Sequence, residues 1–317
     1  MSERGMLSRL AESLFWIGRY IERADDTSRI VDSYVHRMVE DPLNSDDAAC
    51  RSLYAILGIA PPETELFRDE MLHTIAYDEQ SPNSIAGSLN GAYENARRSR
   101  DYISSEMWVA LNTTRLEVSA RRRVAISMGP ATYLAYVRER CALLAGLTDA
   151  TLSHDEGWQF LVLGRNIERI DMTTRLLRGR LAYMDASPDW MAFLRASGAM
   201  EAYMRSTQQL SNPNDVASFL LLNGTFPRSI LFSMKEVAGL LNEIRTADIH
   251  LDSSDVAKAA AAQALERLES VNTADALEDL PALLDQLEST CYLITDAVTD
   301  KYFRHEDAIL WETEQEL

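Results

Sequence analysis

The chain has 317 residues, 46% of them hydrophobic and 25% charged, which is typical of a folded globular protein. Its 31 Lys and Arg residues against 49 Asp and Glu residues give a net charge of -18, which repels phosphate backbones and argues against nucleic acid as a partner. No stretch approaches the roughly 20 apolar residues that cross a bilayer, and the first residues carry no signal-peptide pattern. We therefore expect a cytoplasmic protein without a membrane partner. Three widely spaced cysteines predict reduced thiols: Cys50, Cys141 and Cys291.

The predicted elements are all helices, because apolar residues recur at spacings of three and four and only 13 Gly and 9 Pro interrupt them. In chain order we predict helices at 7–39, 46–58, 63–78, 84–114, 116–127, 130–146, 153–184, 189–208, 213–223, 227–248, 253–271 and 275–302. No linker divides them, so residues 1–305 are expected to form one all-α domain, a single bundle of about ten to twelve helices. The acidic tail at 306–317 is expected to fray or to dock elsewhere.

The first and seventh predicted helices share a phrase that begins Gly-Arg-x-Ile-Glu-Arg. Its two copies lie at 18–31 and 164–177, and eight of the fourteen positions are identical. Such an internal repeat predicts two related halves. We expect the two helices to pair antiparallel about a pseudo-twofold axis, with arginines of one copy meeting carboxylates of the other. The glycine that opens each copy, Gly18 or Gly164, leaves room for another helix or a ligand to approach closely.

The repeat places charged residues beside an apolar stripe, where they become partly buried and need partners. Two interpretations remain open: a salt-bridged ladder that serves packing, or a polar cleft for an anionic or amino-acid-like ligand. In the second interpretation Glu22 and Glu168 are the candidate catalytic groups. The candidate ligand-binding residues of the repeat are Arg19, Arg23, Arg29, Arg165, Arg169 and Arg175.

Two further segments contribute candidates. Arg100 falls on the otherwise apolar line of the helix predicted at 84–114, where either Glu22 or Glu168 would be its partner, unless its side chain simply reaches the helix edge. At 223–229 one helix ends and another begins, so free backbone N–H groups with Arg228 and Ser229 would form an anion site, or only a helix cap.

Several motifs of self-sufficient enzymes are missing from the sequence. The five histidines show no metal-binding spacing, and we find no phosphate-binding loop, dinucleotide fingerprint or nucleophile elbow. We therefore expect the chain alone to bind no metal and no cofactor.

Four ordered segments resemble the bacterial alpha-E domain family: those at 7–24, 96–112, 163–177 and 219–229. The resemblance implies that the chain acts with a circularly permuted ATP-grasp protein, which would bind ATP and Mg²⁺, in making a small peptide or amide. It assigns no catalytic residue to this chain.

Three functional hypotheses follow from the residues and the resemblance. The leading one is a helical subunit that docks with an ATP-grasp ligase and holds the amino acid or short peptide, its arginines gripping carboxylates. The alternative is a stand-alone acyl or aminoacyl transferase in which Glu22 or Glu168 is the general base. In the third, the repeat is purely structural and function lies at a surface interface.

Overall fold

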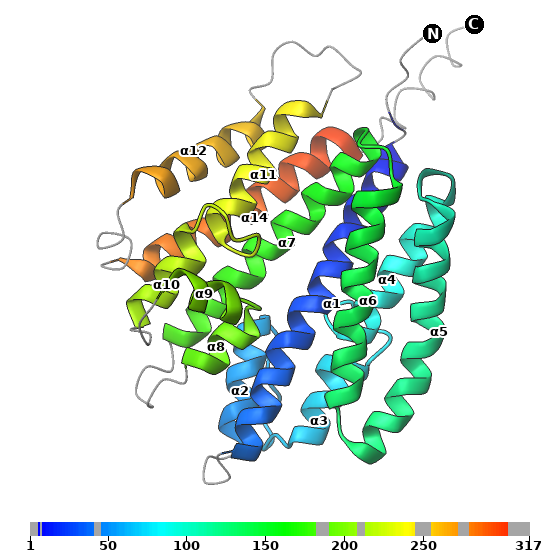
Figure 1. Ribbon diagram of the computed structural model, residues 1–317, viewed down its shortest axis with the longest axis vertical. Coiled ribbons are helices and arrows are strands. Elements are labelled where there is room, and N and C mark those ends of the chain that lie inside the picture. Colours follow the sequence, from blue (N-terminus) through cyan, green and yellow to red (C-terminus); the bar gives the residue numbers. More distant parts are fainter. Residues whose placement is uncertain are drawn as a thin grey trace, which may run out of the picture.

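The computed structural model describes residue 6 and residues 8–40, 46–181, 190–207, 213–244, 255–271 and 279–303. Every regular element in these ranges is a helix, which confirms the all-α prediction (Figure 1). The predicted tail at 306–317 lies outside the described residues. Among the helices described, none is long and apolar enough to cross a membrane.

The described residues form a series of α-helices along the chain. They are α1 (Ser8–Glu40), α2 (Asp46–Leu57), α3 (Arg68–Leu72), α4 (Ile85–Arg98), α5 (Ser105–Met128), α6 (Ala131–Thr151), α7 (Glu156–Leu181), α8 (Trp190–Ala196), α9 (Met200–Ser206), α10 (Pro213–Leu222), α11 (Ile230–Glu243), α12 (Val256–Ser270) and α14 (Leu280–Val298). Short π-helical or 3₁₀ segments lie at His73–Tyr77, Arg100–Tyr102 and Thr299–Phe303.

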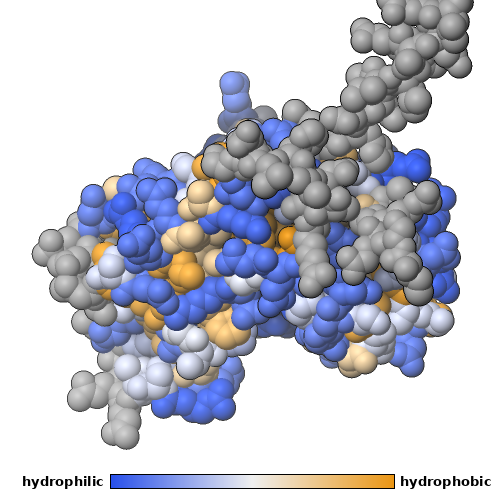
Figure 2. Space-filling view, turned by 90° about the horizontal axis from the view of Figure 1, so that it is seen from above, coloured by the Kyte–Doolittle hydropathy of each residue, from blue (hydrophilic) through white to orange (hydrophobic). Residues whose placement is uncertain are grey.

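Two long helices, α1 and α7, form the centre of the molecule (Figure 1). Helices α4, α6 and α8 pack against α1, while α2, α11 and α14 pack against α7. Both central helices are therefore covered on most sides, and their apolar residues lie in the core. Seen from above, hydrophilic side chains dominate the surface and apolar ones form small patches (Figure 2).

Side-chain caps and glycines set several helix boundaries. Ser84, Ser104 and Ser229 precede α4, α5 and α11, and each hydroxyl accepts a hydrogen bond from the backbone N–H three residues later. Gly129 ends α5 with a φ of 94°, and Gly198 separates α8 from α9 with a φ of 64°. The helix predicted at 189–208 is thus two short helices.

The helix predicted at 84–114 is also wrong, because it breaks between α4 and α5. Ile103 is extended and the Ser104 cap starts a new helix, which continues to Met128 through the break predicted near residue 115. The helix predicted at 63–78 begins only at Arg68. These differences move Arg100 from a long helix into a 3₁₀ turn.

Candidate functional site

The repeated glycines mark the point where α1 and α7 cross. A Cβ added to Gly18 would lie 1.9 Å from the carbonyl oxygen of Leu161, and one added to Gly164 would lie 2.1 Å from that of Phe15. No side chain fits at either position, so the backbones of the two helices touch. The close approach predicted for these glycines is that of another helix.

The two helices run parallel, so the predicted antiparallel pairing is wrong. Near their starts, the N–H of Met6 donates to Glu156 over 3.1 Å, and further along Glu22 meets Arg169. The intervening helices α2 to α6 return the chain to the beginning of α1, and α7 therefore starts at the same end.

Glu168 of α7 is held by two arginines of α1. Its Oε2 lies 2.5 Å from Arg19 Nε, and its Oε1 lies 2.6 Å from Arg23 Nε. The Glu168 side chain is only 1% exposed. Burial alone raises its pKa, but the charges of Arg19 and Arg23 outweigh burial and hold the pKa below the ordinary 4.5.

Glu22 of α1 receives the reciprocal arginine of α7. Arg169 donates from Nε over 2.7 Å and from Nη2 over 2.9 Å, a bidentate pair, and Nη1 of Arg228 lies 3.1 Å away. Burial opposes ionisation, yet Arg169 and Arg228 lower the pKa of Glu22 to about 2. The predicted meeting of arginines with carboxylates across the repeat is therefore confirmed.

Two turns outside the repeat extend this reciprocity. Arg23 donates to the carbonyl oxygen of Pro82 over 3.5 Å, and Arg169 donates to that of Pro227 over 3.1 Å. Both turns carry the pattern Pro-x-Ser-Ile-x-x-Ser, at 82–88 and at 227–233. The serines of the two turns make matching hydrogen bonds to backbone carbonyls: Ser84, Ser88, Ser229 and Ser233. A helix start at residue 84 was predicted, but the likeness of this turn to the one at 227–233 was not, although the shared pattern is visible in the sequence.

Glu22, Glu168 and the arginines that contact them form a central cluster. Its Glu22 side contains more charged residues than its Glu168 side. Arg228 also contacts Asp25 and Asp26, and carboxylate oxygens of Glu22 and these two aspartates lie within 4.8 Å of one another. That spacing suits a cation, and here the guanidinium of Arg228 lies among the oxygens. Burial, opposed by Arg228 and reinforced by Glu22 and Asp25, raises the pKa of Asp26 to about 7.

Three predicted arginines pair at the margins of the cluster. Arg29 contacts Asp25 at 3.1 Å and Arg175 contacts Asp171 at 2.9 Å, each within one helix. Arg165, the counterpart of Arg19, lies 3.3 Å from Asp149 on α6.

The other two candidates do not join the carboxylates. Arg100 lies over the ring of Trp108 at 5.2 Å, so the predicted contact with Glu22 or Glu168 is wrong; the helix that would have aimed it there ends at Arg98. Ser229 is buried, caps α11 through Phe232, and donates to the carbonyl oxygen of Asn223. These bonds are those of the helix-cap interpretation.

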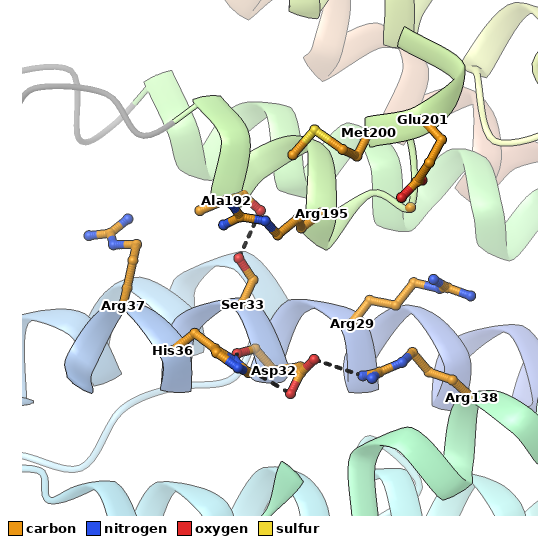
Figure 3. A pocket seen from close by; sticks show the side chains of 11 residues that line it. Arg29, Asp32, Ser33, His36, Arg37, Arg138, Ala192, Arg195, Met200 and Glu201 are labelled. Atoms are coloured by element: carbon orange, nitrogen blue, oxygen red, sulfur yellow. Dashed lines mark hydrogen bonds and ion pairs between the residues drawn. The ribbon is translucent and has the colours of Figure 1, made fainter. Parts of the chain in front are cut away.

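A cavity of about 430 Å³ lies beside the cluster, between the second half of α1, α6 and the α8–α9 turn (Figure 3). Of its charged lining, only Arg29 was a sequence candidate. Arg37 follows on α1, while Arg138 and Arg195 come from α6 and α8. These residues come from three helices that are far apart in the sequence and meet only in the folded structure. No local sequence motif therefore identifies them together.

The fold and the cluster define a class of protein, an all-helical bundle whose central helices are joined by buried arginine–carboxylate pairs. The chain belongs to the Alpha-E family, described as a predicted alpha-helical domain with a conserved ER motif, whose model matches residues 6–303. Both copies of the repeated phrase contain Glu-Arg, at 22–23 and 168–169. The resemblance noted from four sequence segments is thus confirmed.

The chain is also similar to uncharacterized mycobacterial proteins. It is 26% identical to one from Mycobacterium bovis and 25% identical to one from Mycobacterium tuberculosis, each over 262 residues that cover 74% of this chain. The matched region is 30% of the length of each relative. No solved structure shows significant similarity to the chain.

Proposed function

We propose that this chain is a helical module of a larger ligase assembly. It docks with an ATP-grasp protein that forms amide bonds, and it helps to hold the amino acid or short peptide that is extended. ATP and Mg²⁺ are bound by the partner in this proposal. The direction of the proposal comes from the resemblance to the alpha-E family.

The observation that carries the proposal is the length of the relatives. The region that matches this chain makes up only 30% of each mycobacterial protein, so an Alpha-E region works there beside other protein within one polypeptide. We infer that this chain serves a neighbouring protein region as a rigid frame.

The central cluster supplies such a frame. Glu22 and Glu168 are 4% and 1% exposed, and the charged groups they contact are arginines of the same chain. A general base must accept a proton from a substrate within hydrogen-bond reach. A buried carboxylate with a pKa of about 2, such as Glu22, is a poor base. The geometry therefore favours the structural interpretation of the repeat over the transferase alternative.

We further infer that the two halves are related by a pseudo-twofold axis that runs along the crossing. The reciprocal contacts of Gly18 and Gly164 support this relation, as do the exchanged Glu–Arg pairs and the two matched proline turns. In this view the residues of the two repeat copies form the contacts that join the halves.

Co-purification and a ligation assay test the proposed function. The chain is mixed with an ATP-grasp protein encoded in the same genome, and complex formation and ATP-dependent amide formation are measured with and without it. We expect a defined complex and a ligase rate that depends on the chain. Full ligase activity without the chain, together with the absence of a complex, would contradict the proposal.

A further inference from the structure

The cavity beside the cluster differs from the cluster in its charge balance. Four arginines line it against two carboxylates, in a chain whose formal net charge is -18. The arginines are Arg29, Arg37, Arg138 and Arg195, and the carboxylates are Asp32 and Glu201. The cavity thus concentrates positive charge, which raises the local concentration of small anions.

Two of these arginines have guanidinium groups that no carboxylate of the described residues neutralises. Arg195 is exposed at the end of α8, and the Arg37 guanidinium lies over the ring of Tyr34 at 5.4 Å. Figure 3 shows both guanidinium groups on the same side of the cavity. A planar guanidinium group that is not paired with a protein carboxylate can donate two parallel hydrogen bonds to the two oxygens of a ligand carboxylate.

The inner wall offers a further unsatisfied donor. Nη1 of Arg138 is buried and lies 3.0 Å from Asp32 Oδ2, but the pair lacks the alignment of a hydrogen bond. Buried N–H groups without an acceptor are costly, and a ligand oxygen would relieve that cost.

Arg29 lies on the opposite side of the cavity from Arg37, below Glu201 (Figure 3). Its Nε pairs with Asp25. Gly198 lies close to its Nη1, since a Cβ added to that glycine would be 3.2 Å from this nitrogen. The absence of a side chain at Gly198 keeps this part of the wall open beside the guanidinium. Glu201 nearby provides an acceptor for a positively charged group.

We propose that this cavity binds a small acidic zwitterion, a molecule with two carboxylates and one ammonium group. One carboxylate meets Arg37 and Arg195, the other meets Arg29, and the ammonium group is accepted by Glu201. A volume of about 430 Å³ accommodates an acidic amino acid or a short acidic peptide. This inference deepens the proposed function, since it gives the chemical class of the molecule held, but the site lies wholly within this chain.

Calorimetric titration of the isolated full chain at low ionic strength tests the site. The probe is L-glutamate, with glutarate as the analogue that lacks the ammonium group and inorganic phosphate as the competing anion. We expect saturable binding of L-glutamate. Arg37→Ala and Arg195→Ala should each weaken it by about tenfold or more, equivalent to about 1.4 kcal/mol. Arg97→Ala, which removes an exposed arginine paired with Glu94 outside the cavity, is the matched control and should change nothing.

A second variant separates the two ends of the ligand. Glu201→Gln should weaken L-glutamate binding and leave glutarate binding unchanged, while thermal melts confirm that each variant is folded. The proposal is overturned if L-glutamate gives no saturable heat, if phosphate binds more tightly than L-glutamate, or if both arginine variants bind like the parent chain. Because no ligase is present, failure of the docking proposal would leave this titration unaffected, and the two failures are distinguishable.

Discussion

The two sides of the central cluster are built alike but are charged differently. On one side Glu168 meets two arginines of α1, and Asp171 pairs within its own helix. On the other side Glu22 meets Arg169 and Arg228, and Arg228 also holds two aspartates. The second side therefore contains one more acid, Asp26, and takes one of its arginines, Arg228, from outside the repeat.

The extra groups have neutral counterparts in the other half. Met172 stands where the first copy of the repeat has Asp26, and Asn83 stands in the Pro-x-Ser turn where the second turn has Arg228. The acid and the arginine thus occur together on one side and are absent together from the other. The additional buried acid is thus accompanied by an arginine that can neutralise it, as expected where an uncompensated ion costs several kcal/mol.

Neutralising the central glutamate of either side should give the largest loss of stability, and the loss should differ between the two sides. Glu168→Gln leaves Arg19 and Arg23 without their carboxylate and should lower the free energy of unfolding by about 3–5 kcal/mol. Glu22→Gln should cost less, because Arg228 keeps two aspartates. Chemical denaturation at neutral pH measures both.

The control for these variants is Glu94→Gln, which removes an exposed partner of Arg97 and should change stability by less than about 0.5 kcal/mol. Equal losses for Glu22→Gln and Glu168→Gln would show that Asp25 and Asp26 do not compensate the loss of the carboxylate on the Glu22 side.

Replacing either crossing glycine should have the next largest effect and should affect both sides alike. Gly18→Ala or Gly164→Ala forces the two backbones apart and should cost about 3 kcal/mol, the upper end for an overpacked core. Thermal denaturation measures the loss. Gly146→Ala in α6, where an added Cβ meets nothing within 4 Å, is the matched control and should be neutral or stabilising. A melting temperature unchanged in Gly18→Ala would refute the backbone contact.

Introducing the acid and the arginine into the Glu168 side should show whether the two residues stabilise each other there. Met172→Asp buries an extra acid and should destabilise the protein by about 2 kcal/mol or more. Adding Asn83→Arg should recover about 1 kcal/mol of that loss, measured as a coupling energy in a double-mutant cycle. Additive effects would mean that the two turns do not aim their side chains equivalently.

The last prediction concerns a pH dependence that is centred on the Glu22 side, although burial also raises the pKa of Asp171 on the Glu168 side. The folded pKa of Asp26, about 7, lies above its ordinary 3.8, so the folded state binds the proton more tightly. Asp26 therefore reduces stability as the pH rises from about 4 to 7. Glu22 acts in the opposite sense and in another window: its pKa falls from 4.5 to about 2, and its contribution is lost as the pH drops through that range.

Unfolding free energies measured from pH 4 to pH 8 check this assignment. Asp26→Asn should flatten the decline between about pH 4 and pH 7, whereas Glu94→Gln should leave the curve unchanged. If the free energy of unfolding declines between about pH 4 and pH 7 in Asp26→Asn as it does in the parent chain, a group other than Asp26 takes up the proton.

Much of the architecture was predictable because it rests on local patterns. The spacing of apolar residues located the long helices, and the repeat predicted that arginines of one copy meet carboxylates of the other. The break between α4 and α5 was missed because its signal is a serine cap inside a periodic run, where Ser104 competes with helix continuation. The relative direction of α1 and α7 depends on the path of five intervening helices, which no local pattern records.

The site was predictable only in part. Gly18, Glu22, Arg23 and their counterparts carry their signal in the repeat itself. Arg138 and Arg195 of the cavity are single arginines on helices far apart in the sequence, and only tertiary packing makes them neighbours. Arg100 was assigned a wrong partner, because its direction was predicted from one continuous helix. The helix in fact ends at Arg98, and Arg100 lies over the ring of Trp108.

The central claim is that the repeated phrase forms a reciprocal ionic joint between the two central helices. A double-mutant cycle of Glu22→Gln and Arg169→Gln, read by equilibrium unfolding, tests it most directly. The account predicts that the double variant is more stable than the sum of the single losses implies, by about 1 kcal/mol or more. Additive losses, within about 0.3–0.5 kcal/mol, would show that the two residues stabilise the protein independently and would contradict the account.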